Sequence, residues 1–385
     1  MPFVLYLLAL AVFVMLAGLL PAIAADLGVT VATAGLLTSA FAAGMVVGAP
    51  VMAAFARRWP PRRTLLVCLV AFAALHVVGA VTDRFPVLLA ARVFSAVANA
   101  GFLAVALNTA TRLVPEHRKG RALAVLLSGT TIATVAGVPA GAMLGTAVGW
   151  RATFWAIALL CIPAAVGVLR GVDSRPVRTR GGDGRASLRA ELAHLTSPRL
   201  LLAMGLGALV NAGTFAVFTF LAPVVTEVAA LADVWVPVAL VMFGVGSFVG
   251  VTLAGRLSDQ RPCLVLAGGA PLLLAGWILL ALSGSHPVAL MVMILVQGAM
   301  SFGVGSTLIT RVLYAASNAP TMAGAYATAS LNVGAVVGPV LGALGLAAAS
   351  NVMTPVWVAV GLTTAALIIM LAARGQLTTV PVTAA

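Results

Sequence analysis

Long apolar runs separated by short polar segments fill the chain. Each run is long enough for a helix to cross about 30 Å of hydrocarbon at about 1.5 Å per residue. The runs lie near 3–24, 32–56, 64–82, 86–112, 122–147 and 152–170, and then near 200–226, 235–255, 263–283, 288–314, 321–346 and 354–373. They lack the alternation of barrel strands, and a helix satisfies its backbone groups within its own segment. The pattern predicts an all-α membrane protein with twelve spans in two groups of six.

Composition supports this prediction and excludes a soluble domain. Hydrophobic residues make up 62% of the chain and charged residues 8%, with a mean hydropathy of +1.15. A soluble domain is about half apolar and about a quarter charged. The net charge of +13 would favour a nucleic-acid partner if the basic residues formed one surface, but they occur in short clusters between apolar runs. We therefore expect the lipid bilayer, and no nucleic acid, as the partner.

The basic residues predict how the chain crosses the membrane. If the twelve runs all span, nineteen Arg and Lys residues lie on one side, against only Arg84 and Arg151 on the other. Positive charge accumulates on the cytoplasmic side, so we expect both termini in the cytoplasm and the chain in the inner (plasma) membrane. We expect bundles at 1–170 and 200–385, joined by a cytoplasmic linker at 171–199 that is rich in Gly, Arg and Ser.

The two groups of six runs repeat each other. Gly44 and Gly48 correspond to Gly246 and Gly250 at an offset of 202 residues, and Pro139 corresponds to Pro339 at an offset of 200. A nearly constant offset indicates two six-helix halves of the same orientation, related by a pseudo-two-fold axis, which is a known transporter plan.

Small residues recur every fourth position on matched runs of the two halves. Such stripes let helix backbones approach closely in a bilayer, so static packing and a surface for movement both explain them. Prolines inside the stripes remove a helical hydrogen bond and can act as bend points. The hinge candidates are Gly137, Pro139, Gly141, Gly338 and Pro339.

Several motifs resemble the major facilitator superfamily, and within it the twelve-span drug:proton antiporters. "GRLSDQRP" from Gly255 is similar to the superfamily's turn between the second and third helices of a half, and "GVPAGAMLG" and "GWRATFW" resemble the fifth-helix antiporter signature and its sequel. "LVNAGTFAVFTFLAPVVTEV" and "SFGVGSTLITRVLYAA" look most like chloramphenicol-resistance exporters. The resemblance implies export of small hydrophobic drugs by alternating access, coupled to proton influx. A sugar or metabolite exporter on the same scaffold is the alternative.

The chain departs from the resembled pattern at two places. Arg57 occupies the position of an aspartate in the first-half turn, so the gate residues implied by the resemblance are Arg57, Gly255, Asp259 and Arg261, with the acid only at Asp259. A first-helix G-T-x-E-F stretch of similar exporters is also missing here. Its loss predicts weakened or absent proton coupling, and leaves a transport-impaired receptor or scaffold as a third alternative.

All nine acids lie at span ends or in loops, so few titratable side chains remain within the spans. Arg92 is charged within a span, and such a residue usually marks a pathway or relay. His76 has an unperturbed pKa suited to proton handling. Both are candidates for proton coupling. A structural brace at Arg92 and a hydrogen-bonded core histidine at His76 are the alternatives.

Amide, hydroxyl and aromatic side chains supply the substrate-binding candidates. Asn211, Phe215 and Phe218 share one face of the seventh span, which suits a neutral and partly aromatic drug, although a packing stripe also explains the rings. The candidates are Asn99, Asn211, Phe215, Phe218, Gln297 and Ser301. No hydrolase or metalloprotease motif occurs and the three cysteines show no paired spacing, so we expect a protein that is not an enzyme and has no cofactor or metal. Separately, we expect a monomer.

Overall fold

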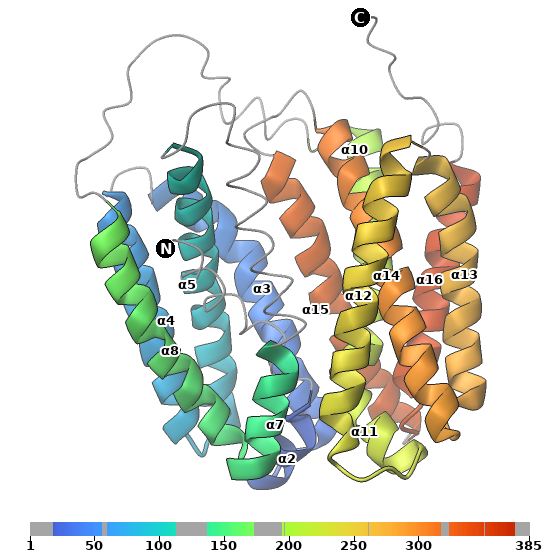
Figure 1. Cartoon of the computed structure of the whole chain (residues 1–385), viewed down its shortest axis with the longest axis horizontal. Helices are drawn as coiled ribbons and strands as arrows, with labels where there is room; N and C mark the ends of the chain where they lie inside the picture. Colours follow the sequence, from blue (N-terminus) through green and yellow to red (C-terminus); the bar gives the residue numbers. More distant parts are fainter. Residues whose placement is uncertain are drawn as a thin grey trace, which may run out of the picture. The chain divides into compact units, whose positions relative to one another are not determined.

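The computed structural model describes residues 18–55, 60–112, 137–172, 195, 197–260, 262–316, 323–349 and 351–373, which contain helices and no strand (Figure 1). The first part of the chain forms α2 (Leu20–Asp26), α3 (Val31–Phe55), α4 (Pro61–Val81), α5 (Phe85–Arg112), α7 (Val138–Val148) and α8 (Trp150–Gly171). The second part forms α10 (Pro198–Thr219), α11 (Leu221–Pro223), the π-helix η4 (Val224–Val228), α12 (Trp235–Gln260), α13 (Pro262–Ser283), α14 (Pro287–Ala315), α15 (Ala323–Ala349) and α16 (Thr354–Ala372).

Ten of the described helices are long and apolar enough to cross a membrane. They agree with ten of the twelve predicted spans, which confirms the all-α membrane fold. The predicted spans 3–24 and 122–147 lie largely outside the described residues, and α2 and α7 are their described ends.

Proline and glycine set the helix boundaries. The helices α4, α10, α13 and α14 each begin at a proline, whose fixed φ suits the first turn and whose missing N–H would have no helical partner there. Gly149 separates α7 from α8 with a φ of +100°, a backbone conformation open chiefly to glycine. This turn places Trp150 and Arg151 at the start of α8.

The chain forms two compact units. Unit 1 consists of Met1–Gly182 and Thr219–Gly244, and unit 2 consists of Asp183–Phe218 and Val245–Ala385. The chain thus leaves unit 2 after Phe218 and returns to it at Val245. The predicted bundle boundaries at 1–170 and 200–385, with the linker at 171–199, remain a prediction.

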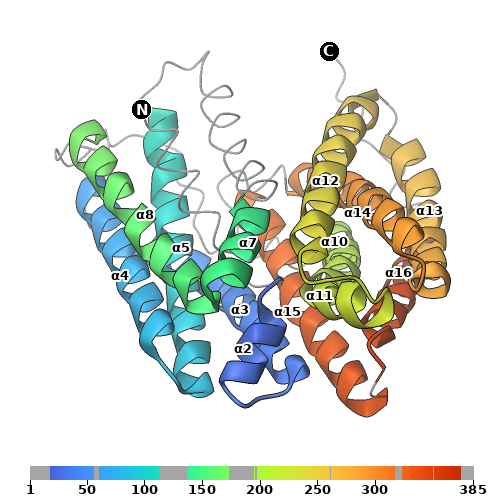
Figure 2. The ribbon, with the colours of Figure 1, turned by 60° about the horizontal axis from the view of Figure 1, so that its bottom comes forward.

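Each unit has its own apolar core. In unit 1, α5 packs against α3 and α4, and α4 packs against α8 (Figure 2). Phe41, Phe72, Phe102 and Ile157 lie in the core between these helices. In unit 2, α13 packs against α14 and α16, and α15 packs against α16 and α14.

Two glycines of α3 bring its backbone against α5. A Cβ atom on Gly44 would overlap the carbonyl oxygen of Val93, and one on Gly48 would lie 2.8 Å from the Cα of Val97. Real Cβ contacts are longer than this, so only glycine permits the observed approach of the two helices.

The same contact recurs in unit 2 between α12 and α14. A Cβ atom on Gly246 would overlap the carbonyl oxygen of Leu295, and one on Gly250 would overlap that of Ala299. All four residues follow their unit 1 counterparts by 202 residues. The repeat predicted from the glycines therefore extends to the backbone atoms that they touch.

The hinge candidates lie in α7 and α15 or directly before α7. Gly338 packs against the carbonyl oxygen of Ala212 in α10, and Pro339 lies inside α15. Gly137 directly precedes α7 and Pro139 lies in its first turn, while the carbonyl oxygen of Gly141 accepts a 3.0 Å hydrogen bond from Thr153 of α8. Their role in movement stays a prediction.

Substitution of Gly250 by alanine tests the close helix contact. Because the added methyl would meet the backbone of Ala299, we expect Gly250→Ala to lower the free energy of unfolding by about 1–3 kcal/mol. Gly305→Ala in α14 is the control, since its Cβ would meet nothing within 4 Å. Thermal denaturation of the purified variants in detergent measures the difference, and equal stability of both variants would contradict the contact.

Candidate functional site

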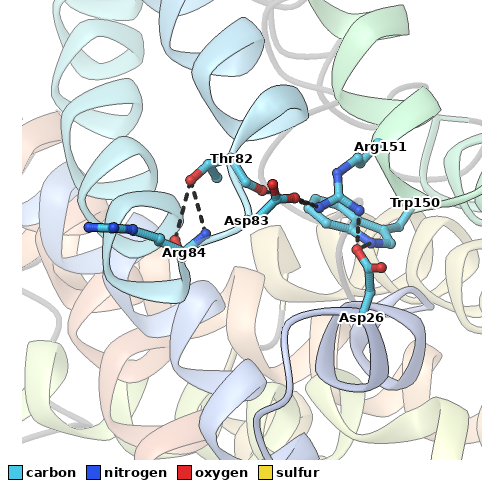
Figure 3. Close-up of polar contacts among 6 residues, drawn as sticks. All are labelled: Asp26, Thr82, Asp83, Arg84, Trp150 and Arg151. Carbon is cyan, nitrogen blue, oxygen red and sulfur yellow. Dashed lines mark hydrogen bonds and ion pairs between the residues drawn. The ribbon is translucent and has the colours of Figure 1, made fainter.

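An ion-pair cluster joins three segments at one end of unit 1. Arg151, in the first turn of α8, forms ion pairs with Asp26 at the end of α2 and with Asp83 between α4 and α5 (Figure 3). Its Nη2 lies 2.6 Å from Oδ1 of Asp83 and donates a 3.2 Å hydrogen bond to the carbonyl oxygen of Thr82. We call Asp26, Asp83, Trp150 and Arg151 the Arg151 cluster.

Trp150 completes the Arg151 cluster. Its indole Nε1 donates a 3.0 Å hydrogen bond to Oδ2 of Asp26, the oxygen that also pairs with Arg151. The Arg151 guanidinium lies 4.5 Å from the centre of the Trp150 ring, within range of a cation–π interaction. Hydrogen bonds from Arg151 and then from Trp150 hold the pKa of Asp26 below its ordinary value of 3.8. Asp26 is therefore ionised at neutral pH, and the cluster fixes α2 to α8.

Sequence reasoning counted Arg151 only as an indicator of membrane sidedness. Its partners Asp83 and Asp26 lie 68 and 125 residues away in the chain. The available signal was the occurrence of all three charged residues at span ends on the same predicted side.

Arg92 is buried in unit 1, with 2% of its surface exposed. Its guanidinium lies 4.4 Å from the centre of the Phe41 ring of α3. Its Nε and Nη2 atoms make no hydrogen bond within the described part of the chain. Buried donors of this kind are costly unless something satisfies them. Among the described residues of unit 1, the Nε and Nη2 donors of Arg92 therefore have no acceptor.

Ser95 and Asn99 are buried on the same helix as Arg92. The Ser95 hydroxyl donates a 2.9 Å hydrogen bond to the carbonyl oxygen of Arg92, and the Asn99 amide lies 3.6 Å from the sulfur of Met45 in α3. Neither side chain bonds to Nε or Nη2 of Arg92 in the part of the chain that the structure describes.

His76 of α4 is buried beside two rings. Its Nδ1 lies 2.8 Å from the carbonyl oxygen of Phe72, and its ring centre lies 4.3 Å from that of Phe72 and 5.7 Å from that of Phe154. Its Nε2 is buried and has no hydrogen-bond partner among the described residues. The Nδ1 contact is thus that of a hydrogen-bonded core histidine, whereas Nε2 has no partner among the described residues.

The seventh-span candidates lie together on α10 of unit 2. The Asn211 amide donates a 2.6 Å hydrogen bond to the carbonyl oxygen of Leu331 in α15. The Phe215 and Phe218 rings meet edge to face with centres 6.1 Å apart, and both are buried. The Asn211 amide therefore contributes to helix packing, whether or not a ligand also contacts it.

Gln297 and Ser301 are both buried on α14. The Gln297 amide nitrogen donates a 3.2 Å hydrogen bond to the carbonyl oxygen of Leu273 in α13. Its Oε1 atom and the Ser301 hydroxyl have no hydrogen-bond partner in the part of the chain that the structure describes. Substrate binding by Asn99, Asn211, Phe215, Phe218, Gln297 and Ser301 stays a prediction.

The predicted charge-controlled gate lies outside the described side chains. Arg57 and Arg261 are not among the described residues, and of Gly255 and Asp259 only the backbone, within α12, is described. The described residues contain no group of three or more His, Cys, Asp or Glu side chains suited to a metal ion.

The repeated helix contacts and the ten apolar helices define a multi-pass membrane protein with an internal repeat. The chain belongs to the major facilitator superfamily, whose family model matches residues 3–339. The predicted fold and family are thereby confirmed, and the chain is a transporter and not an enzyme.

Individual relatives agree with this assignment. The chain is 61% identical to a chloramphenicol resistance protein of Streptomyces lividans over 98% of each chain. It is 30% identical to an inner membrane transport protein of Escherichia coli strain K12, over 94% of this chain and 92% of that one. Among solved structures, a bacterial homologue of the human lysosomal transporter Spinster, in an inward-facing and unoccupied conformation, matches 98% of this chain and 94% of its own with a TM-score of 0.74 and 16% identity. At this identity, the likeness shows the fold alone.

Removal of the Asp26 carboxylate tests the Arg151 cluster. A carboxylate whose pKa is lowered in the folded state stabilises that state above its unfolded pKa, and this contribution is lost as the pH falls through the folded pKa. We expect Asp26→Asn to lower stability near neutral pH by about 1 kcal/mol or less, because the pair is partly exposed. The difference should disappear below the ordinary value of 3.8.

Thermal denaturation of the purified protein across this pH range measures the effect. Asp233→Asn, at an exposed acid before α12, is the matched control and should resemble the unsubstituted protein. A stability gap for Asp26→Asn that persists unchanged in strong acid would contradict the ion pair.

Proposed function

We propose that this transporter exports small hydrophobic drugs of the chloramphenicol type across the inner membrane, by alternating access and in exchange for protons. The observation that carries the proposal is the 61% identity, over 98% of both chains, to a chloramphenicol resistance protein. Because the match extends over nearly the whole of both sequences, it supports a similar substrate.

The buried side chains of α10 support a neutral, partly aromatic substrate. Phe215 and Phe218 form an edge-to-face pair, and Asn211 adds an amide four residues before Phe215. Drug pockets are mostly apolar with a few placed polar groups. A sugar site would instead need many donors and acceptors, so the aromatic pair favours the drug over the sugar alternative.

Proton coupling requires a group whose protonation differs between the two transport states. The described acids, Asp26, Asp83, Glu227, Asp233 and Asp259, all lie at helix ends or between helices. Arg92 and His76 are the described titratable residues buried within spans that leave polar atoms unsatisfied. We therefore assign proton coupling to this pair, in place of the first-helix acid that the chain lacks. This assignment replaces the weakened or absent coupling that the missing stretch alone predicts.

The membrane orientation is part of the proposal. Nineteen basic residues on the side of both termini and of the linker 171–199 support a cytoplasmic position for these segments. The Arg151 cluster then lies on the outer side. The match to an inner membrane transport protein supports the plasma membrane, and we propose a monomer as the working unit.

Loss of the buried cation tests the assigned coupling. We expect Arg92→Gln to reduce proton-driven chloramphenicol efflux by about tenfold or more, because typical coupling between two ligands changes affinity by about 5- to 150-fold. Arg84→Gln, at an exposed arginine immediately before α5, is the control and should keep its efflux. Efflux is measured in an efflux-deficient host, with protein in the membrane quantified for each variant. Normal efflux by Arg92→Gln would remove Arg92 from the mechanism.

Substitutions on α10 test the drug site. An amide and a ring contact different parts of a ligand, so Asn211→Ala and Phe215→Ala should change the susceptibility profile unequally across several drugs. Phe94→Ala, at a ring that is 62% exposed, is the control. Equal loss of resistance to every drug, with less protein in the membrane, would show that these side chains only pack the helices.

A further inference from the structure

The predicted seventh span, 200–226, is not one continuous helix. The helix α10 ends at Thr219, Phe220 has φ −105° and ψ 24°, and the chain continues as the short α11 and the π-helix η4. π-Helical turns are rare and often occur at functional sites. Two residues after η4, Ala230 has a φ of +50°, which is uncommon for a residue with a side chain. The break thus begins where the chain passes from unit 2 into unit 1.

The side chain of Phe220 fills a notch on α3. Its ring is 1% exposed and lies against Gly35, where an added Cβ would come within 2.7 Å of the ring atom Cε1. A residue larger than glycine at position 35 would displace the ring. Val224 and Val225 of η4 are equally buried, so the irregular segment is packed within unit 1.

A second apolar contact lies close to the first in the sequence. A Cβ on Gly18, which precedes α2, would lie 3.0 Å from Cδ1 of Leu240 and 3.5 Å from Cγ1 of Val236 at the start of α12. The short α11 also packs against α2. The segment 219–244 therefore contacts the start of α2 and the beginning of α3 through apolar side chains.

The Arg151 cluster holds α2 through polar contacts. It ties the end of α2 to α8 and to the α4–α5 connection through charged hydrogen bonds. The Phe220 ring is held by apolar contacts instead, and these can separate without leaving a hydrogen-bond donor or acceptor unpaired. When the structure moves, the contacts of Phe220 are thus the ones that can release while α2 and α8 stay together.

We propose that Phe220 is the gating residue of the outer end of the transporter, with Gly35 as its seat. The ring rests on Gly35 when the outer end is closed and leaves when it opens, and the chain bends at the break after Thr219 and at the π-turn that follows. This proposal rests on the proposed function, because alternating access requires repeated halves to separate at one end at a time.

Reversible cross-linking tests the gate. In a background where Cys68, Cys161 and Cys263 are replaced by serine, Gly35→Cys and Phe220→Cys are combined and joined by a short bifunctional thiol reagent that a reductant cleaves. We expect cross-linking to stop chloramphenicol export and reduction to restore it. Full export by the cross-linked protein would overturn the proposal.

The matched control is a second ring seated on a glycine in unit 1. A Cβ on Gly79 of α4 would lie 2.7 Å from Cδ1 of Phe154 in α8. The helices α4 and α8 pack against each other, and both precede the break after Thr219, so they should move together. Cross-linking Gly79→Cys to Phe154→Cys should therefore leave export intact. Loss of export in both pairs would show that any staple in unit 1 stops transport, and would overturn the specific role of Phe220.

Labelling separates failure of the gate from failure of the proposed function. A membrane-impermeant maleimide applied outside the cell should label the single variant Phe220→Cys each time the outer end opens, and should not label Phe154→Cys. This readout needs no drug, so it judges the gate even if the chain exports no chloramphenicol or the double variants do not insert. Absence of labelling at Phe220→Cys in the folded, inserted protein would overturn the gate.

Discussion

Helices in a bilayer must associate without the hydrophobic effect, and close backbone contact at glycine is the interaction on which the rest of this structure depends. Gly44 and Gly48 let α3 lie directly on α5, and Gly246 and Gly250 do the same for α12 on α14. The first of these contacts brings Phe41 onto the Arg92 guanidinium. A buried charge is tolerated there because neighbouring helices, and not lipid, surround it. The repeated fold and the candidate coupling site thus have one physical origin.

The sequence predicts what a single segment determines and misses what distant segments determine together. Ten spans agreed because length and apolarity belong to one run of residues, and the glycine offset of 202 residues exposed the repeat. The Arg151 cluster was missed because its partners lie far apart in the chain. The break at Phe220 was missed because hydropathy is continuous across 200–226, where Pro223 was the local sign of irregular helix. The seat of Phe220 at Gly35 likewise depends on the fold.

The candidate site shows the same limit at single side chains. Burial of Arg92 and His76 follows from their position within apolar spans. The amides of Asn211 and Gln297 are predicted to bind substrate, and the structure shows that both donate to carbonyl oxygens on neighbouring helices, those of Leu331 and Leu273. An amide in a span needs a partner, but the sequence does not distinguish a ligand from a neighbouring helix. Only the arrangement of the helices identifies which polar atoms are already used.

The central claim is that this chain, without another protein, exchanges the drug for protons. The decisive measurement is uptake of chloramphenicol by vesicles that contain only the purified protein and have an acidic interior. The account predicts accumulation against the drug gradient, which collapses when a protonophore removes the pH difference, because each state must bind the proton and the drug with different affinity. Absence of accumulation, or accumulation that the protonophore does not change, would contradict it.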